Sequence, residues 1–167
     1  ISNVEIVKKI CDNFQIHHLY QEDLLNVFQR PKVEEEDNYI FVTFKSLEWH
    51  DTNQDVEEEQ ITAILLCDTV LTFQEKPGDC FGILRERLMV DSSVIRERSV
   101  DYLFYRLLDI TVDTYFDILE KMGDYLEEIE NEILDNPDNA VLLKIQNNKK
   151  DIMQIRKNIY PMRDMLN

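Results

Sequence analysis

The stretch that decides the fold is residues 99–134, SVDYLFYRLLDITVDTYFDILEKMGDYLEEIENEIL. Its apolar side chains recur close to every 3.5 residues over about nine turns, a period typical of a long helix packed along one seam. These positions are Leu103, Leu107, Thr111, Phe116, Leu119, Met122, Leu126, Ile129 and Ile133. The pattern therefore predicts one long helix that begins near Ser99.

A second helix follows after a short break. Asn136-Pro137-Asp138 interrupts the pattern, and Asp138 is expected to cap the next helix. The apolar positions that follow are Leu142, Ile145, Ile152, Ile155, Ile159, Met162 and Leu166. Two long helices joined by a short turn predict an antiparallel helical hairpin over residues 99–167.

Residues 1–98 carry a different pattern, which predicts an α/β part. A helix is expected after an Asn3 cap, and a shorter one from about Tyr20 to Phe28, ended by Pro31. The acidic run of residues 34–37 is expected to be a solvated turn. Tyr39 to Trp49 is aromatic and β-branched with little polar alternation, which predicts a strand covered on both faces.

Turn residues then mark out the next elements. The stretches 59–66 and 69–74 are separated by Cys67-Asp68 and predict a hairpin. Lys76-Pro77-Gly78-Asp79 is a turn sequence, and Asp79 is expected to cap a helix through Leu88. A mixed α/β domain with a protruding helical pair is the architecture that these patterns predict.

Charge narrows the range of partners. The 167 residues include 18 Lys and Arg against 34 Asp and Glu, a formal net charge of −16. This balance argues against nucleic acid and against adsorption to anionic lipid, and it favours cations. Three widely spaced cysteines indicate neither a disulfide framework nor a zinc motif, so a reducing compartment is expected. The chain starts at Ile1 without Met and stops inside a helical pattern, so it is expected to be a piece of a longer protein.

Catalytic motifs are not apparent. His17, His18 and His50 lack metal-site spacing and are expected to be surface or loop residues. The three glycines do not form a phosphate-binding loop, and no cysteine has a nucleophile signature around it. An enzyme is therefore not expected.

Carboxylates are the remaining candidates for chemistry. Asp109, Asp113 and Asp117 recur every four residues and so share one face of the long helix, either as a solvated acidic stripe or as part of a cation site. Glu22 and Asp23 point about 100° apart on a short helix, so they suit two sites or one hydrated ion. Oxygen ligands without Cys or His favour hard cations such as Mg²⁺, which keeps several of its waters.

Several runs resemble the cytoplasmic domain of CorA-type magnesium and cobalt transporters. The longest is residues 17–34, HHLYQEDLLNVFQRPKVE. Phe73-Gln74-Glu75-Lys76 with Phe81 and Arg85-Glu86-Arg87, the stretch from Asp101 to Phe116, and Ile159-Tyr160-Pro161-Met162-Arg163 extend the likeness in order along nearly the whole chain.

The resemblance implies a fold and an assembly. The fold class is then α/β: an α/β/α sandwich with a mixed sheet over residues 1–98, plus the long antiparallel hairpin of residues 99–167. The full-length protein is then a homopentameric channel of the cell inner membrane, with this part on the cytoplasmic side. Its stalk, two membrane helices and Gly-Met-Asn signature would lie outside this chain, so this piece alone would not transport ions.

The resemblance also implies a regulatory metal site. Members bind divalent ions between subunits through carboxylates, and the matching positions here are Glu22, Asp23 and Asp109. The stalk aspartate that would face Asp23 falls beyond Asn167. Mg²⁺, with Co²⁺ as a substitute, would be both transported and regulatory, and bound ions would favour the closed state. Two alternatives stay open: a zinc-transporting relative, and a helical scaffold that docks a partner and uses its acidity only for solubility.

Overall fold

The N-terminal segment folds as two consecutive helices. The computed structural model describes residues 3–78, 80–135 and 138–166, and begins with α1 (Val4–Asn13) and α2 (His18–Leu25). The side-chain oxygen of Asn3 accepts a hydrogen bond from the backbone N–H of Ile6 at 3.2 Å. This contact satisfies a donor that the first helical turn leaves without a partner, and it confirms the predicted cap.

Four strands follow and form one sheet. They are β1 (Lys32–Glu35), β2 (Ile40–His50), β3 (Asp55–Leu65) and β4 (Val70–Gln74), and they lie in that order across the sheet. The long pair β2–β3 keeps one register from Ile40 opposite Leu65 to His50 opposite Asp55. Every side chain of β2 from Phe41 to Leu47 is buried, which confirms a strand covered on both faces.

Two details of the sheet differ from the sequence predictions. Every described strand pair is antiparallel, so the sheet is not mixed. The connections are too short for the crossover that parallel neighbours require, and each strand returns beside the one before it. The acidic run is also not wholly a turn, because Glu34 and Glu35 belong to β1 and pair with Phe41 and Ile40. Charged residues are common on edge strands, where they oppose pairing with other chains.

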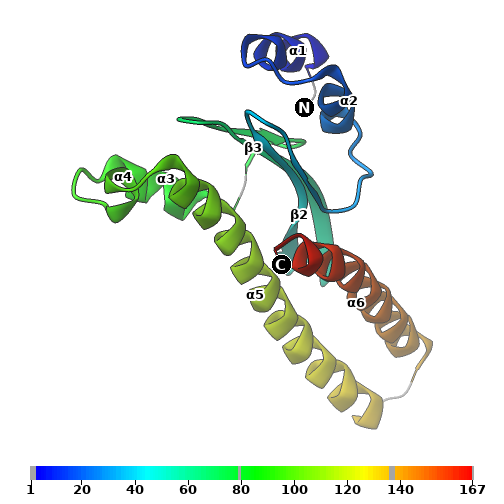
Figure 1. The fold of residues 1–167 in the computed structure, drawn as a ribbon. Coiled ribbons are helices and arrows are strands. Elements are labelled where there is room, and N and C mark those ends of the chain that lie inside the picture. The colour runs from blue at the N-terminus through cyan, green and yellow to red at the C-terminus, as the bar shows by residue number, and fades with distance from the viewer. Residues whose placement is uncertain (1–2, 79, 136–137, 167) are drawn as a thin grey trace.

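The second half of the chain is almost entirely helical. The short helices α3 (Gly82–Met89) and α4 (Val94–Glu97) lead into α5 (Val100–Asp135), and α6 (Asn139–Leu166) returns beside it (Figure 1). The Asp138 carboxylate accepts hydrogen bonds from the backbone N–H groups of Ala140 and Val141, as expected of a cap. The helical hairpin is thereby confirmed. Asn136, Pro137 and the proposed cap Asp79 lie outside the described residues.

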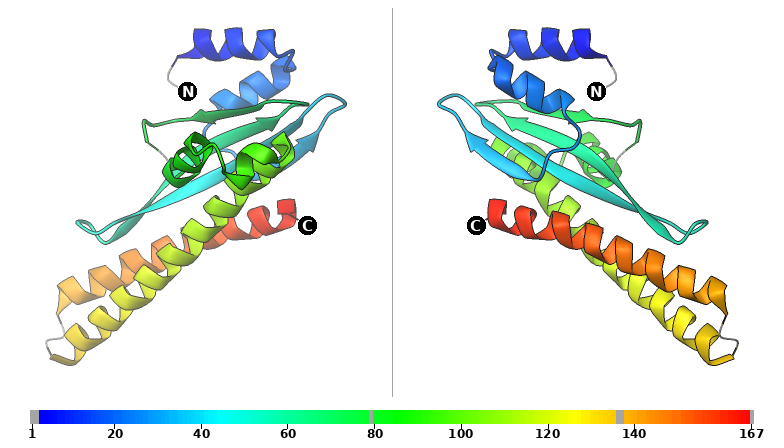
Figure 2. Two further views of the ribbon diagram at one scale, coloured as in Figure 1. Left: turned by 90° about the vertical axis from the view of Figure 1, so that its left-hand side faces the viewer. Right: turned by 90° about the vertical axis from the view of Figure 1, so that its right-hand side faces the viewer.

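The sheet is sandwiched between the two helical groups (Figure 2). On one face, Phe41 and Ile64 of the sheet pack with Val7 and Leu24 of α1 and α2. On the other face, a larger core joins sheet residues to α3, α4, α5 and α6; it includes Phe44, Ile61, Met122 and Ile155. This is the expected α/β/α arrangement. Among the helices that the structure describes, none is long and apolar enough to cross a membrane.

Candidate metal-binding site

The helix α2 holds the first two candidate carboxylates at the surface. Leu24 is fully buried, and Gln21 is buried while its amide donates to the Ile16 carbonyl and to the Asp12 carboxylate, both at 3.1 Å. These inward contacts fix the helix on the sheet. Glu22 is therefore exposed and Asp23 lies at the helix edge, with 28% of its side chain exposed.

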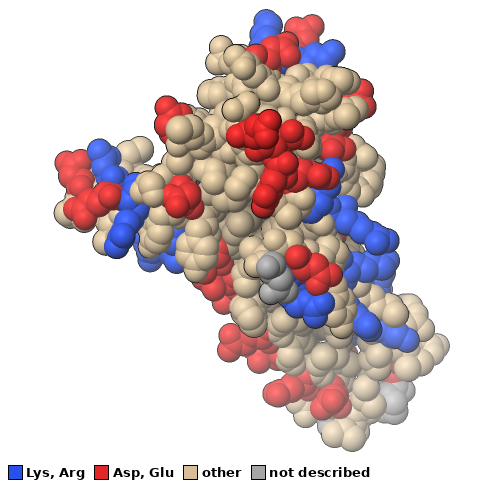
Figure 3. All heavy atoms as spheres, viewed as in Figure 1, with Lys and Arg blue, Asp and Glu red and all other residues tan. Residues whose placement is uncertain are grey.

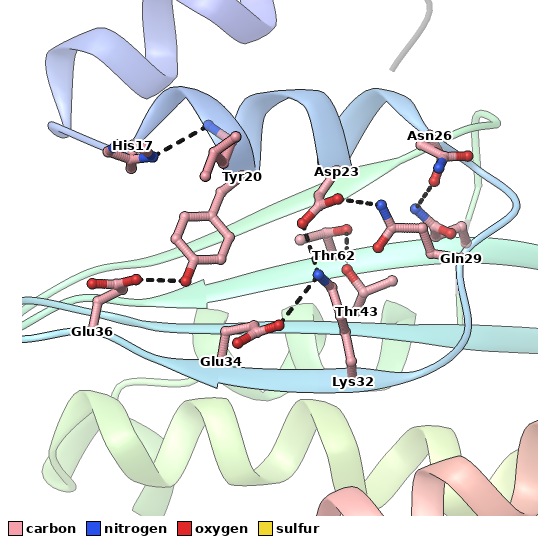
Figure 4. Close-up of polar contacts among 12 residues, drawn as sticks. His17, Tyr20, Asp23, Asn26, Gln29, Lys32, Glu34, Glu36, Thr43 and Thr62 are labelled. Carbon is pink, nitrogen blue, oxygen red and sulfur yellow. Dashed lines mark hydrogen bonds and ion pairs between the residues drawn. The ribbon is translucent and has the colours of Figure 1, made fainter.

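Both oxygens of Asp23 already have partners within the chain (Figure 4). The Gln29 amide donates to Oδ1, and the Lys32 ammonium contacts Oδ2 at 2.7 Å. Lys32 also reaches Glu34 at 3.4 Å and lies 5.9 Å from the centre of the Phe41 ring. The Asp23 carboxylate is consequently held in one orientation, and its charge is partly balanced by Lys32.

The pKa of Lys32 reflects the negative charges of Asp23 and Glu34 beside it. Partial burial acts to lower that pKa, because it disfavours the charged amine, but the hydrogen bonds and negative charges of Asp23 and Glu34 outweigh it. The net result is a raised pKa, so Lys32 stays charged at physiological pH. A divalent ion that approaches Asp23 must therefore displace this ammonium or act through its own water shell.

Asp109 occupies a similar position on α5. Arg106, one helical turn earlier, forms an ion pair with its Oδ2, and the Tyr105 hydroxyl donates to Oδ1 at 3.2 Å. The nearby Asp109 charge raises the pKa of Tyr105. The Asp109 side chain is 29% exposed, almost the same fraction as that of Asp23. Each candidate is thus an oriented, partly exposed carboxylate with one basic neighbour.

The structure does not gather the three candidates into one cluster. Glu22 and Asp23 lie on α2, whereas Asp109 lies on α5, which packs on the opposite face of the sheet. Among the described residues, no group of three or more His, Cys, Asp or Glu side chains is arranged to hold a metal ion. A site with several direct protein ligands would need groups from outside these ranges or from another subunit.

The other polar candidates are placed individually. Asp113 and Asp117 are exposed on α5, and Asp117 borders a cavity of about 600 Å³ between α5 and the β2–β3 hairpin. The Nδ1 atom of His17 accepts from the backbone N–H of Leu19 at 3.3 Å and so caps α2. His50 contacts Glu57 across the hairpin at 2.9 Å.

A match to a known protein family shows which proteins are related to this chain. Residues 3–167 match the family described as CorA-like Mg²⁺ transporter protein. The chain belongs to this family. The run 17–34 that carries the resemblance includes both Asp23 and its partner Lys32.

Individual CorA relatives agree with the family match. The cobalt/magnesium transport protein CorA of Thermotoga maritima is 39% identical over 166 residues, and the putative metal ion transporter YfjQ of Bacillus subtilis is 29% identical over 157 residues. These alignments cover 99% and 93% of this chain but 47% of each relative. The chain thus spans about half the length of the curated relatives that it matches.

Solved structures support the fold. The soluble domain of CorA from Methanocaldococcus jannaschii superposes with a TM-score of 0.84 at 22% identity, over 98% of this chain and 65% of that chain. The complete CorA magnesium transporter of the same organism gives 0.80 at 21% identity, over 98% of this chain and 51% of that chain. At these identities the likeness establishes the architecture alone.

The partners of the candidate carboxylates were not among the sequence predictions. Arg106 lies three residues before Asp109, a spacing that brings side chains together on a helix, so this pair was detectable. The contact of Lys32 with Asp23 was not detectable in this way, because the two residues meet only after the chain leaves α2 and enters β1. The strand β1 begins at Lys32, two residues before the acidic run of residues 34–37 that was predicted to be a turn.

Proposed function

We propose that this chain is the Mg²⁺-sensing part of a CorA-type channel for Mg²⁺ and Co²⁺, and that it acts without enzymatic activity. Glu22, Asp23 and Asp109 are the residues proposed to lie nearest the regulatory ion. The observation that carries the proposal is the Asp23 carboxylate, which is held in a fixed orientation at the surface within the run that resembles the family. The 39% identity to a cobalt/magnesium transport protein supports the choice of ions.

The separation of the carboxylates favours a site between subunits. Each candidate offers an oriented carboxylate, but Asp23 and Asp109 lie on different helices and each has a cationic neighbour. Mg²⁺ dehydrates reluctantly and is commonly held through its waters. We therefore assign to these residues the binding of a hydrated ion, completed by a carboxylate of a neighbouring subunit.

Charge supplies the mechanism of regulation. Five copies of a chain with a net charge of −16 would gather about −80 around one axis. Screening at physiological salt extends over only about 8 Å, so facing carboxylates at short range would still repel. A bound Mg²⁺ would replace that repulsion by bridging and hold the closed arrangement. Loss of the ion would release the subunits, provided that the ion has a higher affinity for the closed arrangement.

The assembly and location belong to the same proposal. The full-length protein is proposed to be a homopentamer in the cell inner membrane, with this part on the cytoplasmic side. The partners are then neighbouring subunits and divalent cations, with no nucleic acid. The donor set contains hard oxygen ligands and no soft ones, which favours Mg²⁺ over Zn²⁺.

Protease protection tests the proposal in the full-length channel. Mg²⁺ should slow cleavage of this part of the wild-type protein, compared with Na⁺ at matched ionic strength. Asp23→Asn and Asp109→Asn should each raise the Mg²⁺ concentration needed for protection by about tenfold, because each removes a carboxylate near the ion. They should also make the channel harder to close.

Asp117→Asn is the matched control, since Asp117 is an exposed aspartate on the same face of α5 as Asp109. It should leave protection unchanged. If Asp23→Asn and Asp109→Asn both leave the protection and the Mg²⁺ dependence of current intact, the proposed site is wrong. Equal effects of all three substitutions would indicate general charge screening.

A further inference from the structure

A basic groove lies beside the α2–β1 connection. Residues 28–30 face the second half of α6 across a groove of about 780 Å³. Four basic residues line it, and Glu58 is the one acidic residue among the described lining residues; the basic ones are Arg30, Lys45, Lys150 and Lys157. Lys and Arg atoms gather between this connection and α6, at the right of Figure 3. In a chain of net charge −16, such a groove is unexpected.

The cations of the groove are not neutralised by the fold. Lys45 is 6% exposed, and its ammonium donates to the Val27 carbonyl at 2.6 Å, a partner without charge. Within the described ranges, Arg30, Lys150 and Lys157 form neither a hydrogen bond nor an ion pair, and the one charge interaction among them is the influence of Lys150 on Asp151. Glu58 accepts from the Asn158 amide at 2.9 Å and keeps its negative charge, but it is one carboxylate against four basic residues. The groove therefore keeps an excess of positive charge that can act on a ligand.

An aromatic side chain stands at the edge of the groove without a role in the core. Phe28 is 93% exposed, which is a large apolar area to leave in water. Tyr160 also lines the groove, and the guanidinium groups of Arg156 and Arg163 each lie 5.3 Å from the centre of its ring. Aromatic rings beside basic groups are the combination that proteins use to hold a nucleotide base and its phosphates.

We propose that this groove binds a nucleoside polyphosphate. The phosphates would lie against Arg30, Lys150 and Lys157, and the base would stack on Phe28. Guanidinium and ammonium groups form short, charge-assisted hydrogen bonds with phosphate oxygens. The volume of the groove is within the range of small-molecule sites, and its concave form favours a compact anion over an extended acidic peptide. None of the candidate metal ligands lines this groove.

Calorimetric titration with two probes tests the site. ATP and inorganic triphosphate are titrated into this chain in the presence of chelator, so that no divalent ion bridges probe and protein. Both should bind saturably. The double substitution Lys150→Gln with Lys157→Gln should weaken both probes by about tenfold or more, because it removes two charged donors.

The Phe28→Ala variant separates the base from the phosphates. It should weaken ATP by about fivefold or more through the loss of stacking, and leave triphosphate unchanged. Phe116→Ala is its control, since Phe116 is 66% exposed on α5 and lies outside the groove. If Phe28→Ala affects neither probe, the base contact is wrong and the nucleoside part of the proposal fails.

A charge-matched control tests specificity. Lys9→Gln with Lys149→Gln removes the same charge from exposed positions outside the groove. It should leave both affinities unchanged. The proposal is overturned if neither probe binds saturably at millimolar concentration, or if the two double variants weaken binding equally. It is also overturned if the groove variants abolish self-association in sedimentation while the probes do not bind, since the groove would then hold an acidic surface of another copy.

Discussion

The two long helices of the hairpin differ sharply in charge. Helix α5 carries eleven Asp and Glu against two Lys and Arg, whereas α6 carries six Lys and Arg against two Asp. Acidic atoms follow the outer side of α5, and basic atoms gather over α6 (Figure 3). Opposite charges and apolar side chains are the two possible sources of attraction between these helices.

The burial of apolar side chains on both helices favours the second explanation, and Met122 of α5 lies in one core cluster with Ile155 and Met162 of α6. Met122 and Ile129 of α5 are each 2% exposed, and Ile155 and Met162 of α6 are 1% and 2% exposed. Among the described residues, Lys144 and Glu132 form the one ion pair that joins the two helices. Most charges therefore point outward, where they are available to ligands or to other subunits. The net charge of −16 for the whole chain therefore describes neither the acidic surface of α5 nor the basic surface of α6.

The largest expected effect comes from the apolar seam, meaning the buried apolar side chains of α5 and α6. Ile155→Ala should lower the free energy of unfolding by about 3 kcal/mol, because it removes a fully buried side chain and leaves a cavity. Ile152→Ala is the control on the same helix. Ile152 is 41% exposed, so its substitution should cost less than about 1 kcal/mol. Urea unfolding followed by circular dichroism measures both, and equal costs would contradict an apolar seam.

The second effect concerns a buried charge on α6. Asp151 is 8% exposed, and burial raises its pKa, with a further contribution from the negative charge of Asp55; Lys150 acts in the opposite direction. Asp151→Asn should therefore raise the free energy of unfolding at pH 7 by about 1 kcal/mol, because it removes a charge that burial and Asp55 disfavour. Asp124→Asn, at an exposed position on α5, should have little effect.

The pH dependence of this gain has a definite sign. Because the folded state holds the Asp151 proton more tightly than the unfolded state, the wild type loses stability from this group as the pH rises from the unfolded pKa through the folded one. The Asp151→Asn variant has no carboxyl group at this position and does not lose stability in this way. The difference between the two proteins should be near zero at about pH 3 and complete at neutral pH. A difference that is constant with pH would show that charge is not its cause.

The long helices were predictable, but not all of their buried faces. Periodicity placed the first helix at Ser99 and the structure begins α5 at Val100. Phe116 and Leu119 were assigned to the seam, yet they are 66% and 41% exposed. The buried position is Tyr115, whose hydroxyl donates to the Lys45 carbonyl of β2. Apolarity alone favoured Phe and Leu, whereas packing against the sheet selected a tyrosine with a specific polar partner.

The charged sites were less predictable, for a topological reason. The resemblance to CorA-type transporters identified Glu22, Asp23 and Asp109 as candidates, but Lys32 reaches Asp23 only through the fold of β1. The basic groove draws its cations from three separate segments, namely the α2–β1 connection, β2 and α6. The net charge of the whole chain does not reveal such a local cluster of basic residues. A net charge of −16 for the whole chain therefore does not exclude phosphate-bearing ligands from this groove.

The smallest expected effect is that of the ion pair between the helices. The Lys144 ammonium lies 2.6 Å from the Glu132 carboxylate, and their side chains are 41% and 43% exposed. Water competes for both groups, and holding two long side chains in place costs entropy, so the pair should contribute less than either preceding substitution. A double-mutant cycle with Glu132→Gln and Lys144→Gln isolates the coupling. It should be small and favourable at low salt and should vanish at about 1 M NaCl, where screening is nearly complete. A coupling that persists there and rivals the effect of Ile155→Ala would mean that opposite charge, rather than the apolar seam, joins α5 to α6.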